Sequence, residues 1–93
     1  MAVVVIANIP GGTAEQDDQI QNELNLAGNP APGALVRVAG AVPGGWRVMS
    51  VWESEDAFAA FRRERLAPAL QKAGRQMPDL EIWPVHSVRI PPR

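Results

Sequence analysis

The sequence predicts an α+β fold whose elements follow the order β-α-β-β-α-β. Two observations carry this prediction. The 93-residue chain contains four apolar or alternating stretches typical of strands, and two segments with helical spacing of apolar residues lie between them. Each helical segment also follows a hydroxyl residue, Thr13 or Ser54, of the kind that accepts a hydrogen bond from an orphan N–H at a helix start.

The first strand is predicted over residues 2–9, which read AVVVIANI and are almost continuously apolar and rich in β-branched side chains. Such a run is typical of a central strand with both faces buried. Thr13 is predicted as the N-cap of the first helix, with Gln16 completing a capping box. Gly28 is predicted to end this helix, because glycine readily adopts the left-handed conformation found there.

The second and third strands are predicted over residues 34–42 and 46–53, joined by the turn Pro43-Gly44-Gly45. A short glycine-containing connection between two strands indicates a hairpin. The third strand runs almost directly into the second helix, which is predicted to begin after Ser54 with two acidic residues in its first turn. Negative charge is favourable there because it meets the positive end of the helix dipole.

The second helix is predicted to be kinked or broken at Ala67, because Pro68 disfavours helical backbone in the residue before it. Gly74 is predicted to end the helix. The fourth strand is predicted over residues 80–90. Pro84 cannot donate to a strand ladder, so this strand is expected at an edge of the sheet or with a bulge.

This order of elements is that of the ferredoxin-like split unit with an antiparallel sheet. Right-handed crossovers place the first and third strands in the centre and the second and fourth at the edges. Two helices can cover only one face of the sheet, yet Val, Met or Trp occupies the opposite face in three strands. An apolar face of this size is uncommon in a monomer, so we expect two copies to pack sheet to sheet as a C2 homodimer.

Composition narrows the class of protein. Residues 1–93 suit one domain, and the net charge of −1 and pI near 5.7 provide no basic field for nucleic acid. The chain has no cysteine and one histidine, so no disulfide, thiolate or other metal site is expected. No apolar stretch approaches the roughly 20 residues that span a bilayer, and no signal peptide is evident. We expect a soluble cytoplasmic protein.

Nearly the whole chain resembles the dimeric α/β-barrel superfamily, in particular the small antibiotic-biosynthesis-monooxygenase-like proteins. The resemblance rests on four segments: Val51-Trp52-Glu53-Ser54, Glu55-Asp56-Ala57-Phe58 with Phe61, Leu66-Ala67-Pro68-Ala69-Leu70, and Trp83-Pro84-Val85-His86. It implies a ferredoxin-like homodimer with a ligand cleft between the sheet and the helices of each subunit. Its members include cofactor-free oxygenases of aromatic polyketides, haem-degrading enzymes, cyclases, dehalogenases and binding proteins, so the fold does not select a reaction.

The resemblance suggests catalytic candidates. Asn8 matches a first-strand asparagine that in some relatives faces the pocket and polarises the ligand or oxygen, although it could equally bond nearby backbone. His86, the lone histidine, is either a base or a packed residue. Phe61 and Gln71 stand where haem-degrading relatives carry a Trp and a ligating His, and Gln is a poor iron ligand. Haem is therefore not expected, and we predict no cofactor.

Three aromatic residues, Trp52, Phe58 and Phe61, are predicted to form apolar walls of the ligand pocket. Tryptophans elsewhere, Trp46 and Trp83, are expected in the core or the dimer interface. Arg37 lies among apolar neighbours on a strand, where a guanidinium needs a carboxylate. The expected carboxylate belongs either to the protein, as Glu53 or Glu81, or to an acidic ligand. Alternatively, Arg37 is an edge-strand residue that faces water or pairs across the dimer.

Two functions are consistent with these residues. The first is a cofactor-independent monooxygenase-like enzyme that acts on a small aromatic or polyketide-type molecule. The second is a non-catalytic dimer that binds a small apolar ligand or another protein, which needs a pocket but no positioned acid or base. The absence of tyrosine and cysteine, and the single histidine, favour the second.

Overall fold

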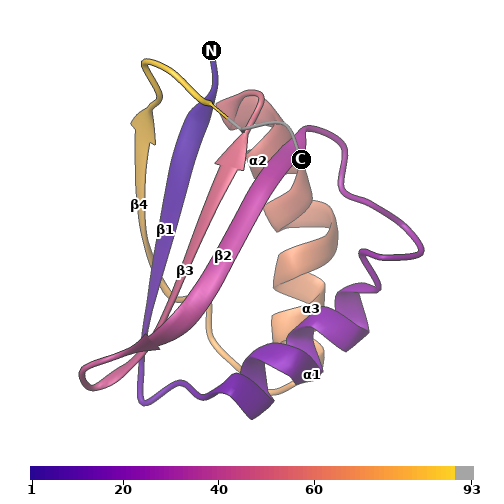
Figure 1. Ribbon diagram of the computed structural model, residues 1–93. Helices are drawn as coiled ribbons and strands as arrows, with labels where there is room; N and C mark the ends of the chain where they lie inside the picture. Colours follow the sequence, from indigo (N-terminus) through magenta and orange to yellow (C-terminus); the bar gives the residue numbers. More distant parts are fainter. Residues whose placement is uncertain (90–93) are drawn as a thin grey trace.

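The computed structural model describes residues 1–89, which form one four-stranded sheet and a layer of helices beside it (Figure 1). Within this range no helix is long and apolar enough to cross a bilayer. The elements in chain order are β1 (Val3–Pro10), α1 (Ala14–Leu24), β2 (Ala34–Val42), β3 (Gly45–Trp52), α2 (Glu55–Phe61), the π-helical segment η1 (Arg62–Leu66), α3 (Ala67–Lys72) and β4 (Asp79–Pro84).

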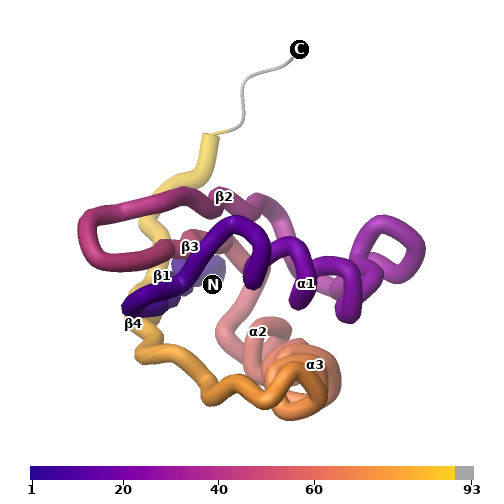
Figure 2. Tube along the Cα trace, turned by 90° about the horizontal axis from the view of Figure 1, so that it is seen from below, coloured from indigo at the N-terminus to yellow at the C-terminus, as the bar shows by residue number. Residues whose placement is uncertain are grey.

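The sheet has the strand order β2-β3-β1-β4, and every neighbouring pair is antiparallel. This confirms the predicted ferredoxin-like arrangement, with β1 and β3 in the centre. Helices α1, α2 and α3 all lie on the same side of the sheet (Figure 2). We call this side the helix face and the opposite side the outer face.

Helix α1 begins as predicted and ends earlier than predicted. The Oγ1 atom of Thr13 accepts a hydrogen bond from the backbone N–H of Gln16 at 3.2 Å. The helix ends at Leu24, because Asn25 adopts the left-handed conformation (φ 51°) and its N–H bonds to the carbonyl of Gln21. The prediction of Gly28 as the stop is wrong, since asparagine tolerates this conformation as well.

The helix after β3 keeps helical backbone through Ala67 (φ −61°, ψ −44°), so it is not broken there; the predicted irregularity takes the form of the π-helical segment η1 between α2 and α3. Ser54 caps α2 by accepting from the N–H of Ala57 at 3.0 Å. Pro68 has no N–H to bond the carbonyl four residues earlier, and the N–H of Ala67 instead reaches Arg62 in η1. Gly74 (φ 72°) ends α3, as predicted.

Strand β4 is shorter than the predicted range 80–90. It ends at Pro84, and within residues 1–89 one further backbone bond, from Val85 N–H to the carbonyl of Ala2 at 2.9 Å, extends the pairing. The strand stops because proline supplies no donor for the next rung of the ladder. Residue 90 lies outside the described residues.

The helix α1 packs mainly on α3. Its two buried residues, Ile20 and Leu24, form an apolar cluster with Ala69 and Leu70. Polar contacts support the same pairing: the guanidinium of Arg65 donates to the carbonyl of Leu24 at 2.7 Å, and Lys72 Nζ lies 2.7 Å from Glu23 Oε1. A separate cluster joins the sheet to α2 through Val3, Val5, Ala31, Trp52 and Phe58.

The Lys72–Glu23 pair predicts a measurable titration. The hydrogen bond that the Lys72 ammonium donates to Glu23, and then the charge of that carboxylate, raise the pKa of Lys72 above the ordinary 10.5. The stabilisation is therefore fully present below pH 10.5 and is lost as the pH rises through the pKa of the folded state. An NMR titration should give Lys72 a higher pKa in the native protein than in the Glu23→Gln variant, and equal values would contradict the pairing.

The close approach of β3 to the end of β1 predicts that Gly45→Ala lowers the free energy of unfolding by about 1–3 kcal/mol. A Cβ atom on Gly45 would lie 2.3 Å from the carbonyl oxygen of Ile9 and 2.9 Å from the nitrogen of Gly11, and backbone atoms cannot move aside as side chains do. Gly40→Ala is the matched control, because nothing lies within 4 Å of its Cβ position. Urea denaturation of the two variants tests the difference.

Candidate functional site

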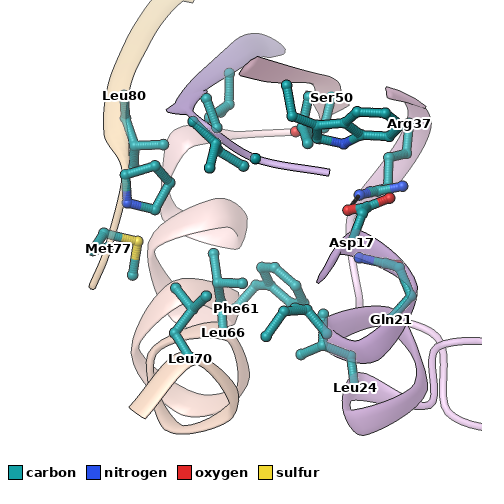
Figure 3. Close-up of a pocket in the computed structure, with 18 of the residues that line it drawn as sticks. Asp17, Gln21, Leu24, Arg37, Ser50, Phe61, Leu66, Leu70, Met77 and Leu80 are labelled. Carbon is teal, nitrogen blue, oxygen red and sulfur yellow. Dashed lines mark hydrogen bonds and ion pairs between the residues drawn. The ribbon is translucent and has the colours of Figure 1, made fainter. Parts of the chain in front are cut away.

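A cavity of about 720 Å³ lies between the helix face of the sheet and the helices (Figure 3). A volume of this size is typical of sites that enclose small organic molecules. Residues from β1, α1, β2, β3, α2, η1 and α3 line it, together with the loop before β4. The cavity is therefore bounded by the helix face of the sheet on one side and by the helices on the other.

The cavity exists because α1 packs on α3 and not directly on β2 and β3. Its apolar stripe is thin, and Ile20 and Leu24 are already used against α3. The residues of α1 that line the cavity beside them are polar: Gln16, Asp17 and Gln21. Such side chains do not collapse onto an apolar sheet, so space remains between the two.

Three aromatic rings form the wall at the α2 end of the cavity. The ring centroids of Trp52 and Phe58 are 5.5 Å apart in an edge arrangement, and those of Trp52 and Phe61 are 4.9 Å apart. Trp52 and Phe58 are each 4% exposed, so the wall is fixed by packing. Leu66, Leu70, Met77 and Leu80 continue the apolar lining toward β4 (Figure 3).

The opposite end of the cavity, between β2 and α1, is polar. Arg37 Nη2 lies 2.5 Å from Asp17 Oδ1, and the Asp17 side chain is only 13% exposed. Ser50, the register partner of Arg37 on β3, accepts a hydrogen bond from Trp52 Nε1 at 2.9 Å. The Ser50 hydroxyl hydrogen is thus free to donate elsewhere, and Arg37, Asp17, Ser50 and Gln21 share one part of the cavity (Figure 3).

The carboxylate that meets Arg37 is neither Glu53 nor Glu81, as the sequence suggested, but Asp17. The prediction was wrong because both candidates lie in or beside strands of the sheet, whereas the observed partner lies twenty residues earlier in the chain, on α1. Ser50, Asp17 and Gln21 were not singled out from the sequence. The alternation of β3, which places Trp46, Val48, Ser50 and Trp52 on one face, was the available signal for Ser50.

The structure brings four of the six predicted site residues to this cavity with their side chains: Trp52, Phe58, Phe61 and Arg37. Asn8 borders the cavity at the end of β1, but its Oδ1 accepts a hydrogen bond from Arg47 Nε at 2.8 Å. Strand alternation places both of these side chains on the outer face.

His86 is exposed, lies beyond the end of β4 and is not part of the cavity lining. For Asn8, the sequence left open a hydrogen bond to nearby backbone; the observed partner of its Oδ1 is the side chain of Arg47. The catalytic assignments of both residues stay predictions. Among residues 1–89, no group of three potential metal ligands comes together.

The two remaining tryptophans lie on opposite sides of the sheet. Trp46 lines the cavity, and no residue of the described chain accepts a hydrogen bond from its buried Nε1. Trp83 is 46% exposed on the outer face, where Val38 (54%) and Met49 (40%) are exposed as well. The outer face is thus an apolar surface that the chain itself does not cover.

No protein-family model matches the chain. No curated protein matches it either. Several solved structures do match. The three described next share 13–21% sequence identity with this chain, so they bear on the fold alone.

A Chloroflexus aurantiacus protein assigned by name to the antibiotic biosynthesis monooxygenases has a TM-score of 0.64 at 18% identity, with 98% of this chain and 100% of that chain covered. A Nitrosomonas europaea protein of unknown function gives 0.67 at 21% identity, covering 99% and 94%. SnoaB of Streptomyces nogalater, a cofactor-independent oxygenase, gives 0.62 at 13% identity, covering 94% and 93%. The chain therefore has the fold of the antibiotic-biosynthesis-monooxygenase-like proteins.

Proposed function

We propose that this protein binds a small aromatic or polyketide-type molecule in the cavity and oxygenates it with dioxygen, without a cofactor. The observation that carries the proposal is the cavity of about 720 Å³ beside the rings of Trp52, Phe58 and Phe61. Flat aromatic walls suit a flat aromatic ligand, because rings gain both buried area and favourable ring–ring contacts.

The proposed reaction converts a methylene group of an electron-rich ring system into a carbonyl. One oxygen atom of dioxygen enters the product and the other leaves as water, and the substrate's own methylene group supplies the two hydrogens and the electrons. The apolar walls would displace water from the faces of a bound ring system, and electrostatic contacts strengthen where water is displaced. Arg37 and Ser50 would donate hydrogen bonds to a carbonyl oxygen of the substrate and so orient the ring system in the cavity.

The second candidate, a binding protein without catalysis, is favoured by the placement of Asn8 and His86. The amide of Asn8 is engaged by Arg47 on the outer face, and His86 lies away from the cavity. Neither offers a base to a bound molecule within one copy of the chain. Ligand binding in the cavity is common to both candidates.

Oxygen uptake separates the two candidates. The protein is incubated with an anthrone, and oxygen consumption and quinone formation are followed beside a ligand-affinity measurement. Turnover above buffer that disappears in Phe61→Ala supports the enzyme, and Asn8→Ala and His86→Ala then report whether either residue contributes. Measurable affinity with no turnover supports the binding protein, and the absence of both contradicts the cavity as a functional site.

We also propose that the protein acts as a homodimer joined through the outer faces of two sheets. The exposed apolar residues Val38, Met49 and Trp83 support this arrangement, since a monomer rarely leaves such a surface in water. The central strand β1 adds Val4 and Ile6 to the same face. The ligand cavity would then lie on the far side of each sheet from the interface.

A further inference from the structure

The charges around the cavity cancel. Of the charged residues that line it, two are arginines, Arg37 and Arg75, and two are aspartates, Asp17 and Asp79. Arg37 is the positive group beside Ser50, and its guanidinium is already held by Asp17. The cavity therefore offers no unpaired cation to an acidic ligand at its polar end.

Hydrogen-bond donors nevertheless remain available at that end. A guanidinium carries five N–H groups, and Asp17 is the one side chain among residues 1–89 that bonds to that of Arg37. The hydroxyl of Ser50 accepts from Trp52 Nε1 and keeps its own hydrogen for another partner. A ligand oxygen placed here would meet two donors from adjacent strands, since Arg37 and Ser50 are register partners.

The charge of Asp17 decides which oxygen fits. A carboxylate on the ligand would approach Arg37 and Asp17 at similar distances, so attraction and repulsion would largely offset each other. It would also lose its hydration shell on entering a mostly apolar cavity, which is costly for an ion. A neutral carbonyl oxygen accepts the same hydrogen bonds without either penalty.

We propose that the cavity selects neutral apolar molecules that carry a carbonyl oxygen, which binds at the corner formed by Arg37 and Ser50, and that Asp17 excludes carboxylates. This inference rests on the proposed function, because it takes the cavity as the ligand site. It assigns Asp17 as the specificity residue. It also gives the ligand an orientation, with its apolar end toward Leu70, Met77 and Leu80 (Figure 3).

Three naphthalenes of similar size test the selection by equilibrium dialysis: 2-acetylnaphthalene, 2-ethylnaphthalene and 2-naphthoate. The ketone is expected to bind about tenfold more tightly than the hydrocarbon, which corresponds to about 1.4 kcal/mol, and at least tenfold more tightly than the carboxylate. Ser50→Ala should reduce the advantage of the ketone over the hydrocarbon. Ser50→Thr, which keeps the hydroxyl, should restore it.

The decisive variant is Asp17→Asn, which keeps the shape of the side chain and removes its charge. It is expected to raise the affinity for 2-naphthoate at least tenfold, because Arg37 is then unneutralised, and to leave the affinity for 2-ethylnaphthalene unchanged. Asp18→Asn is the matched control, since Asp18 is the next residue on α1 and does not line the cavity. Circular dichroism checks that each variant is folded.

The outcomes are distinguishable. If the carboxylate binds the native protein as tightly as the ketone, or if Asp17→Asn does not raise its affinity, the selection is wrong while the cavity remains a ligand site. If none of the three compounds binds the native protein, the proposed function fails and this inference fails with it.

Discussion

Replacing Trp52 with alanine is expected to lower the free energy of unfolding by about 3–5 kcal/mol, a large share of what a domain of this size has. Trp52 is 4% exposed and joins the sheet to α2 through its contacts with Phe58 and Phe61. Its indole N–H also bonds to Ser50. The alanine variant loses both the ring contacts and the hydrogen bond, and it extends the existing cavity. Urea denaturation followed by far-UV circular dichroism measures the change.

Trp52→Phe is the graded control, because it keeps an aromatic ring and deletes the N–H donor. It is expected to cost about 1–2 kcal/mol, clearly less than the alanine change. A cost of less than about 1 kcal/mol for Trp52→Ala would mean that the aromatic wall does not hold the sheet and α2 together.

The second large effect concerns assembly: Met49→Lys is expected to convert the proposed homodimer into a monomer. Met49 lies on the central strand β3, is 40% exposed and pairs with Ile6 and Val38 on its two neighbours. In a sheet-to-sheet dimer a lysine here would be buried without a partner, which costs several kcal/mol and weakens association about a hundredfold or more. Sedimentation velocity at micromolar concentration measures the mass.

Met77→Lys is the matched control for assembly. Met77 is exposed to a similar degree (37%) but lies in the loop before β4, away from the outer face. It should leave the mass unchanged. A native protein that sediments as a monomer, or a Met49→Lys variant that remains dimeric, would contradict association through the outer face.

Most of the fold is readable from local sequence signals. The caps at Thr13 and Ser54 and the hairpin between residues 34 and 52 each follow from the chemistry of one or two residues, and the structure has all of them. The irregularity expected near Pro68 is present as the π-helical segment η1, without a break in the helix. The two errors of extent have the same origin. Helix α1 ends before Asn25 instead of at Gly28, and β4 ends at Pro84 instead of residue 90. In each case a residue before the predicted end interrupts the hydrogen-bond pattern.

The candidate site was less accessible to prediction. The aromatic wall follows from the resemblance and from strand and helix periodicity, since Trp52, Phe58 and Phe61 fall on the inner faces of their elements. The Arg37–Asp17 pair depends instead on where α1 lies relative to the sheet. No local pattern encodes that position, because it follows from the packing of Ile20 and Leu24 against α3.

The attachment of α1 has an evolutionary consequence. Between this helix and the sheet, the side-chain polar contact within residues 1–89 is the Arg37–Asp17 pair, whereas its apolar support comes from α3. Substitutions along α1 can therefore widen, narrow or recharge the chamber while the strand ladder keeps its geometry. A single architecture of this kind can diversify its chemistry through one helix.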